Sequence, residues 1–118
     1  MHHDLPFLLS RQVGPFVFVS GKVGVDPASG EIAKGDVKAQ THQIFTNMST
    51  ELAQYGLDLS SVVKTTVFLT DMRQFEAMNE AYRANLTEPL PTRSCVSVSG
   101  LPHVDALVEI ELIAYTEG

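Results

Sequence analysis

The clearest pattern in the chain lies over residues 106–115, where every second residue is apolar, and it predicts a β-strand with two unlike faces. One face is wholly apolar and consists of Val108, Ile110, Leu112 and Ala114. The other face places Glu109 and Glu111 among apolar neighbours. A carboxylate in such surroundings needs a partner or a chemical task, because an unpaired buried charge is very costly.

A second strand is predicted over residues 93–99. Its faces are Arg93, Cys95, Ser97 and Ser99 on one side, and Ser94, Val96 and Val98 on the other. The turn-like residues 100–105 follow, so we expect an antiparallel hairpin with the Glu109 strand. Matching apolar faces would put Arg93 and Glu109 on the same opposite face. A plain ion pair that fixes the register is the alternative interpretation.

Two helices are predicted from residues spaced at helical intervals. The first runs over residues 37–55, with Asp36 as N-cap and Gly56 at its end. Its apolar residues are Val37, Ile44, Phe45, Met48 and Leu52. The second starts near Asp71 and ends before the prolines at 89 and 91. Its apolar residues are Met72, Phe75, Met78, Tyr82 and Leu86.

The remaining strands are expected at residues 16–21 and 62–70, with an edge strand at 5–9 and a turn at 26–30. In the strand at 62–70, Val63, Thr65, Val67 and Leu69 share one face. The whole order predicts an α+β fold, a single mixed β-sheet with two helices packed on one face. The other face is uncovered and is expected to carry Arg93, Cys95 and Glu109. An oligomer that buries this face is therefore the default expectation.

Length and composition narrow the class of protein. The 118 residues predict one domain, 1–118. A net charge of −6 argues against binding to nucleic acid. No apolar run approaches the length of a membrane span, and the N-terminus does not resemble a signal peptide. A single cysteine fits a reducing compartment, so we expect a cytoplasmic location, with an organelle as the alternative.

Common catalytic and metal-binding motifs are missing from the sequence. The glycines at 21 and 24 lack the spacing of a phosphate-binding loop, and the four histidines lack metal-ligand spacing, so no metal is expected. Cys95 is either a thiol activated by Arg93 or a small buried side chain. Asn79 lies near the apolar stripe of the second helix, where we expect it to bond to a neighbouring segment.

Several segments together resemble the RidA family, also called YjgF/YER057c, the reactive imine/enamine deaminases. They are residues 19–22, 26–30, 35–40, 62–71, 91–96 and 108–111. The sequences RSCV at 93–96 and VEIE at 108–111 are the most specific of these. The resemblance covers nearly the whole chain in the correct order.

The resemblance implies a chorismate-mutase-like fold that assembles as a homotrimer, with a central barrel and clefts between subunits. In the family, the arginine matching Arg93 holds the substrate carboxylate, and the glutamate matching Glu109 lies beside the attacking water. Ser20, Asn79 and Cys95 also match cleft positions. Phe7 stands where the family often has a tyrosine, so a hydroxyl is lost. No cofactor is implied.

The implied activity is hydrolysis of short 2-imino acids, 2-iminopropanoate (from 2-aminoacrylate) and 2-iminobutanoate, to 2-keto acids and ammonia. Three alternatives stay open. They are a non-catalytic ligand-binding or chaperone-like trimer, an endoribonuclease that inhibits translation, and a deaminase of a larger substrate such as 2-aminomuconate. The acidic charge makes the ribonuclease the weaker of these, and Phe7 leaves the larger substrate open.

Overall fold

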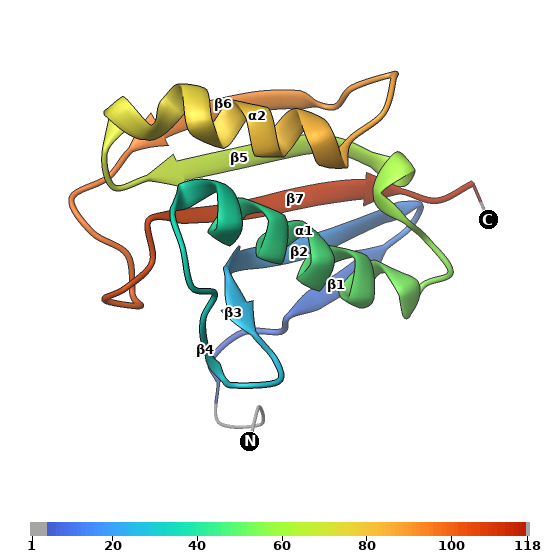
Figure 1. Cartoon of the computed structure of the whole chain (residues 1–118). Helices are drawn as coiled ribbons and strands as arrows, with labels where there is room; N and C mark the ends of the chain where they lie inside the picture. The colour runs from blue at the N-terminus through green and yellow to red at the C-terminus, as the bar shows by residue number, and fades with distance from the viewer. Residues whose placement is uncertain (1–4, 118) are drawn as a thin grey trace.

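The computed structural model describes residues 5–117 and shows a five-stranded sheet, a two-stranded hairpin and two α-helices (Figure 1). The elements are β1 (Ser10–Val13), β2 (Phe16–Val23), β3 (Val25–Asp26), β4 (Glu31–Ile32), α1 (Val37–Ala53), the 3-10 turn η2 (Leu59–Ser61), β5 (Val62–Leu69), the 3-10 turn η3 (Met72–Gln74), α2 (Phe75–Asn85), β6 (Thr92–Ser97) and β7 (Val108–Tyr115). The predicted α+β class, with two helices and a mixed sheet, is confirmed. None of the helices described has the length and apolar character of a membrane span.

The strand order β1-β2-β7-β5-β6 corrects the predicted hairpin. β6 pairs with β5 and runs parallel to it, while β7 lies between β2 and β5 and is antiparallel to both. The hairpin is wrong because α2 returns the chain to the start of β5, which makes β6 parallel. Residues 98–107 then carry the chain past β5 to the centre of the sheet. The amides of Val98 and Thr70 anchor that crossing, through bonds to the carbonyls of Leu69 and Leu107.

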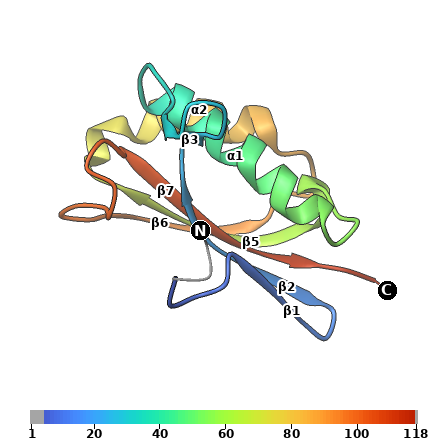
Figure 2. The ribbon, with the colours of Figure 1, turned by 90° about the horizontal axis from the view of Figure 1, so that it is seen from below.

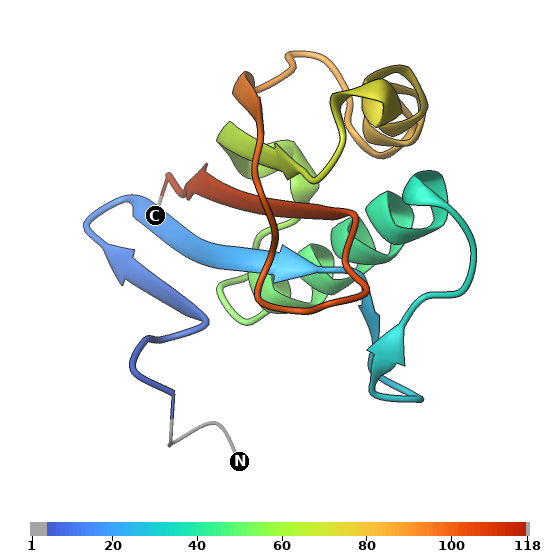
Figure 3. The ribbon, with the colours of Figure 1, turned by 90° about the vertical axis from the view of Figure 1, so that its left-hand side faces the viewer.

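Both helices lie on one side of the sheet, which we call the helix face (Figures 2 and 3). Between it and the helices lies a single core, to which β7 contributes Val108, Ile110, Leu112 and Ala114, as predicted. The opposite side, which we call the open face, has no helix over it in the described part of the chain. Its alternate residues on β7 include the partly exposed Glu109 and Ile113.

The predicted start of α1 is confirmed by its N-cap, and the helix ends two residues before the predicted residue 55. Asp36 Oδ1 accepts hydrogen bonds from the amides of Lys38 and Ala39, at 3.0 and 3.2 Å. The α-helix ends at Ala53, and a turn leads to Gly56, whose φ of 73° favours glycine. These local signals are therefore sufficient to place the helix that carries much of the core.

Three local expectations are wrong. The edge strand expected at 5–9 lies at β1 instead, because Ser10 is the first residue to enter the ladder with β2. Met72 is exposed because it belongs to η3 and precedes the helix. Val63 is also exposed, and Val62 takes the buried position, since the pairing of β5 with β7 shifts register at this point.

Candidate functional site

Arg93 is held under α2 at the edge of the sheet. It lies opposite Thr65 of β5, a buried residue of the helix face, so its side chain points toward the helices. Its Nη1 donates a hydrogen bond of 2.7 Å to Asn79 Oδ1. Its guanidinium carbon lies 4.7 Å from the ring centroid of Tyr82 and 5.5 Å from that of Phe75. Cation–π contacts and one hydrogen bond thus orient the guanidinium and leave donors for an anion.

A small hollow opens beside this arginine. It measures about 190 Å³ and is lined by Asn79, Tyr82, Arg83, Leu90, Pro91 and Arg93. The hydroxyl of Tyr82 lies 2.7 Å from that of Thr65, and burial raises the pKa of Tyr82, so this phenol stays neutral. The hollow therefore offers a fixed positive charge between polar and apolar walls, a setting that suits a small carboxylate.

Cys95 lies two residues beyond Arg93, on the same helix face and opposite Val67. It packs against the core. Burial raises the pKa of its thiol, and the nearby Arg93 charge only partly opposes this. The thiol is thus protonated at neutral pH, which disfavours the activated-thiol interpretation and favours a packing role.

Glu109 and Glu111 lie on the open face, opposite Phe68 and Thr66 of β5. Burial, with a smaller contribution from the Glu111 charge, raises the pKa of Glu109. The Glu109 carboxylate lies against Gly21 of β2, where an added Cβ would be 2.9 Å from Glu109 Cδ. Glycine at this position is therefore required for the carboxylate to lie where it does.

Gly21 and Ser20 form a β-bulge in β2. Val19 pairs with Leu112 and Lys22 pairs with Ile110, so two residues of β2 lie opposite one residue of β7. Bulges of this kind bend a strand locally and are common beside active sites. Here the bulge places Gly21 against Glu109, while Ser20 lines the same hollow as Glu111.

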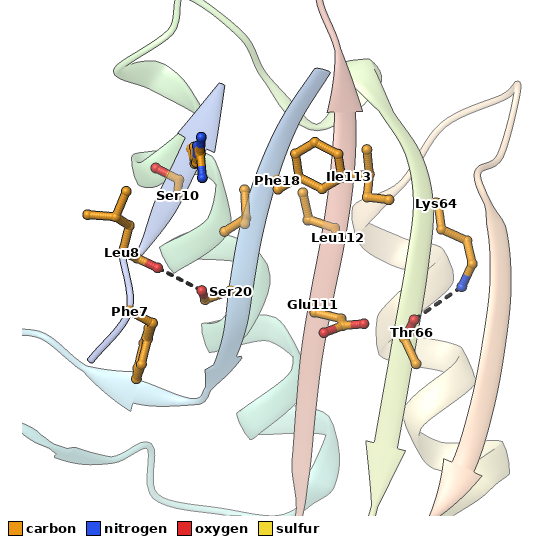
Figure 4. A pocket seen from close by; sticks show the side chains of 12 residues that line it. Phe7, Leu8, Ser10, Phe18, Ser20, Lys64, Thr66, Glu111, Leu112 and Ile113 are labelled. Atoms are coloured by element: carbon orange, nitrogen blue, oxygen red, sulfur yellow. Dashed lines mark hydrogen bonds between the residues drawn. The ribbon is translucent and has the colours of Figure 1, made fainter. Parts of the chain in front are cut away.

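A larger hollow of about 530 Å³ lies on the open face next to the bulge (Figure 4). Its lining is Phe7, Leu8, Ser10, Arg11, Phe18, Val19, Ser20, Lys64, Thr66, Glu111, Leu112 and Ile113. The Ser20 hydroxyl donates to the Leu8 carbonyl at 2.7 Å, and the Ser20 amide donates to the Leu9 carbonyl at 3.0 Å. These two bonds attach the Phe7 segment, residues 7–9, to the bulge.

The sequence-predicted residues therefore fall into two groups. Arg93, Asn79 and Cys95 lie on the helix face, whereas Phe7, Ser20 and Glu109 belong to the open side. The expectation that Arg93, Cys95 and Glu109 share the uncovered face is wrong. It fails because the side chains of Arg93 and Cys95 on β6 point toward the helices, where α2 provides partners for Arg93. The alternate residue Val96 then lies on the open face, where it is 44% exposed.

Sequence reasoning missed the residues of β5 that line the larger hollow. Lys64 Nζ donates to Thr66 Oγ1 at 3.1 Å, and Figure 4 shows Thr66 beside Glu111, with Lys64 on its other side. The signal was present in the alternation of Lys64, Thr66 and Phe68, which places them on one face of β5. Within residues 5–117 no three His, Cys, Asp or Glu side chains gather as metal ligands would. The first two histidines, His2 and His3, lie outside the described residues.

Comparison with known proteins assigns the chain to a family. A sequence profile described as Endoribonuclease L-PSP, which represents the YjgF/RidA family, matches residues 6–116. The chain belongs to the RidA family. A relative from Salmonella typhimurium, named 2-iminobutanoate/2-iminopropanoate deaminase, is 40% identical over 92% of this chain and 86% of its own.

Other RidA-family relatives carry names that say less about chemistry. A protein of Pyrococcus abyssi, named only as a RutC family protein, is 45% identical over 95% of this chain and 87% of its own. The crystal structure of E. coli TdcF with bound serine has a TM-score of 0.86 and 37% identity, and covers 95% of this chain and 89% of its own. The RidA-family fold is thus shared over almost the full length.

Proposed function

We propose that this RidA-family chain is a hydrolytic deaminase of short 2-imino acids, which it converts to 2-keto acids and ammonia. The observation that carries the proposal is the Arg93 guanidinium, oriented by Asn79 and Tyr82 beside an open hollow. A relative 40% identical is named for this activity, which adds support. The TdcF structure, with serine bound, shows that a similar protein takes a small molecule bearing a carboxylate.

Arg93 acts in this proposal as the anchor for the substrate carboxylate. A guanidinium binds two carboxylate oxygens through parallel N–H bonds, and the rings of Tyr82 and Phe75 restrict its motion. A fixed carboxylate leaves the imine carbon in one orientation. Placement is the main need of this reaction, because a protonated imine is already electrophilic.

Glu109 acts as the proton carrier. Water adds to the imine carbon while Glu109 accepts one of its protons, and the C–N π bond becomes a lone pair on nitrogen. The same carboxyl then returns the proton to nitrogen, and the resulting carboxylate takes the proton of the new hydroxyl as the C–N bond breaks and the C=O bond forms. That proton passes to the departing ammonia, which leaves as ammonium. The raised pKa of Glu109 suits both steps, because burial makes its carboxylate a stronger base than that of an ordinary glutamate.

The two groups belong to opposite faces of the sheet, so the working site takes Arg93 from one subunit and Glu109 from its neighbour. The open face supports such an assembly because it exposes large apolar side chains. They include Phe16, Phe18, Val63, Val96 and Tyr115. We propose a homotrimer in which the open faces form a central barrel and the clefts between subunits hold the imino acid.

The first test replaces Arg93. Arg93→Ala should abolish hydrolysis of freshly generated 2-aminoacrylate, while light scattering still gives three times the 12.9 kDa chain mass. Arg93→Lys should also be poor, because an ammonium lacks the bidentate fork. Full activity in the alanine variant would overturn the role of the arginine, and a stable monomer would overturn the shared cleft.

A complementation experiment tests the shared cleft directly. Arg93→Ala and Glu109→Gln chains, each with little or no activity alone, are co-expressed in equal amounts. If each site uses one residue from each of two neighbours, random mixing restores about one quarter of the wild-type activity. Mixed assemblies that stay inactive would show that each chain supplies both residues of its own site.

The family profile's description, Endoribonuclease L-PSP, favours RNA cleavage as the second candidate. The net charge of −6 opposes it, because RNA backbone binding relies on Lys and Arg. The two functions separate in one assay of a fluorescent RNA. We expect no cleavage above buffer at enzyme concentrations that hydrolyse the imino acid. Cleavage that Arg93→Ala abolishes would favour the ribonuclease.

A further inference from the structure

Glu51 of α1 lies on the helix face, away from Glu109, yet it contacts both sides of the β2 bulge. Its Oε2 accepts a hydrogen bond from the hydroxyl of Ser10, which pairs with Val19 just before the bulge. Its Oε1 lies 3.7 Å from Nζ of Lys22, the residue just after the bulge. The two oxygens of one carboxylate thus connect the strand segments that flank Ser20 and Gly21.

This arrangement is a specific one. Glu51 is only 7% exposed and occupies the apolar side of α1, where a leucine would fit the helical pattern. A carboxylate there is tolerated because it has a charged partner and a hydroxyl donor, and Tyr55 Oη lies 2.7 Å from the same Ser10 hydroxyl. We call these four residues, Ser10, Lys22, Glu51 and Tyr55, the Glu51 cluster.

The bulge that the Glu51 cluster flanks carries two parts of the open face. Its Ser20 holds the Phe7 segment through the carbonyls of Leu8 and Leu9. Its Gly21 lies against the carboxylate of Glu109. Ser10 is also the one residue of β1 that is not exposed, so it is the contact between this edge strand and the helix layer. A shift of the bulge would therefore move the Phe7 segment and Glu109 together.

We propose that Glu51 is a positioning residue, which holds the bulge from the helix side and so fixes where Glu109 and the Phe7 segment lie. The role in catalysis rests on the function proposed above, whereas the effect on the bulge does not. Glu51 itself touches no substrate. Its contribution is to fix the positions of β1 and β2 relative to each other through Ser10 and Lys22.

The first experiment measures the bulge without any substrate. Amide hydrogen exchange of Ser20, whose N–H bonds to the Leu9 carbonyl, is compared in wild type, Glu51→Gln and Ser10→Ala. We expect exchange at Ser20 to accelerate by about tenfold or more, while amides of the β5–β7 ladder keep their rates. Glu80→Gln is the matched control, since it removes a carboxylate from the exposed Lys38–Glu80 pair.

The exchange result decides between a local and a general role. Equal acceleration at all amides would mean that Glu51 only stabilises the fold, which would overturn the proposal. Unchanged exchange at Ser20 would overturn it as well. Ser10→Ala removes a single hydroxyl and keeps the test available if Glu51→Gln does not fold.

The second experiment measures turnover of the imino acid. Glu51→Gln and Lys22→Met should each lower kcat on the order of tenfold, because small misplacements of a reacting group are costly. KM should change little, since Arg93 is the anchor and lies far along the sheet, on β6. A loss that appears only in KM contradicts the role. If wild type itself does not hydrolyse imino acids, the proposed function fails, and the exchange data still decide whether Glu51 holds the bulge.

Discussion

The two faces of the sheet differ sharply along a single strand. On β7, Ile110 and Leu112 are buried against the helices, while Glu109 and Glu111 alternate with them on the open face. One face stabilises the chain through apolar contact, and the other presents groups that need a partner. The comparison teaches that alternate residues of one strand divide two roles: one face contributes to the apolar core, and the other carries the candidate catalytic groups. Arg93 is the exception, because it belongs to the helix face.

The largest expected effect comes from the helix face. Ile110→Ala should lower the free energy of unfolding by about 2–5 kcal/mol, because it leaves a cavity in a fully buried site. Urea denaturation at a fixed protein concentration measures this. The matched change on the open face is Phe18→Ser, at a residue 45% exposed in the chain. It should instead weaken the trimer on dilution, as seen by light scattering. If Phe18→Ser leaves the mass of the assembly unchanged on dilution, the proposed role of the open face in assembly is wrong.

Glu109 and Glu111 sharpen the comparison within the open face. Glu109→Gln should lower kcat by roughly 100-fold, because it removes the proton acceptor but keeps the shape. Binding of a carboxylate ligand, measured by calorimetry, should change little. Glu111→Gln should instead weaken assembly or stability and keep kcat at neutral pH. The assignment of the two carboxylates is reversed if only the Glu111 variant loses turnover.

The pH profile gives a finer measure of the same pair. Glu109 must be ionised to accept a proton, and burial raises its pKa, so kcat should fall on the acid side at a pH above the ordinary range of a glutamate. The Glu111 charge raises this pKa further. Glu111→Gln should therefore move the acid limb to lower pH. A limb that stays in place would show that another group controls it.

Phe7→Tyr is the smallest expected change. It adds the hydroxyl that the family often has at this position, on a side chain that lines the hollow of the open face. We expect kcat/KM for 2-iminopropanoate to change by roughly two- to tenfold, the size of one hydrogen bond. The ratio of rates for 2-iminopropanoate and 2-aminomuconate, measured in both proteins, tells whether the hydroxyl sets substrate preference. Phe18→Tyr serves as the control, since it adds a hydroxyl elsewhere in the same hollow.

Local signals in the sequence were sufficient for the elements that depend on local physics. Asp36 and Gly56 placed α1, and the alternation of β7 identified its buried face. The partner of β6 was not predictable in the same way, because it depends on where α2 returns the chain. The side of the sheet that Arg93 occupies depends on Asn79 and on the aromatic rings of α2. Because these residues do not belong to β6, the alternation of β6 alone does not reveal them.

The Glu51 cluster shows a further limit. Its residues come from β1, β2, α1 and the turn after α1, and no spacing in the sequence connects Ser10 and Lys22 with Glu51. The bulge at Ser20 and Gly21 is likewise invisible in the alternation of β2, since one extra residue shifts the register only relative to β7. Residues that act by contacts between segments far apart in the sequence can be identified only from the structure.

The central place of β7 has a consequence for how the protein is made. Within residues 5–117 this strand follows all the other strands, yet it separates β2 from β5 and pairs with both. During synthesis, the β1–β2 hairpin and the β5–α2–β6 unit emerge from the ribosome with no strand to join them. The apolar residues of the hairpin and of the β5–α2–β6 unit are expected to stay exposed to water or bound to a chaperone until Tyr115 has left the exit tunnel. From this topology we expect the sheet to be completed only when β7 is inserted between β2 and β5.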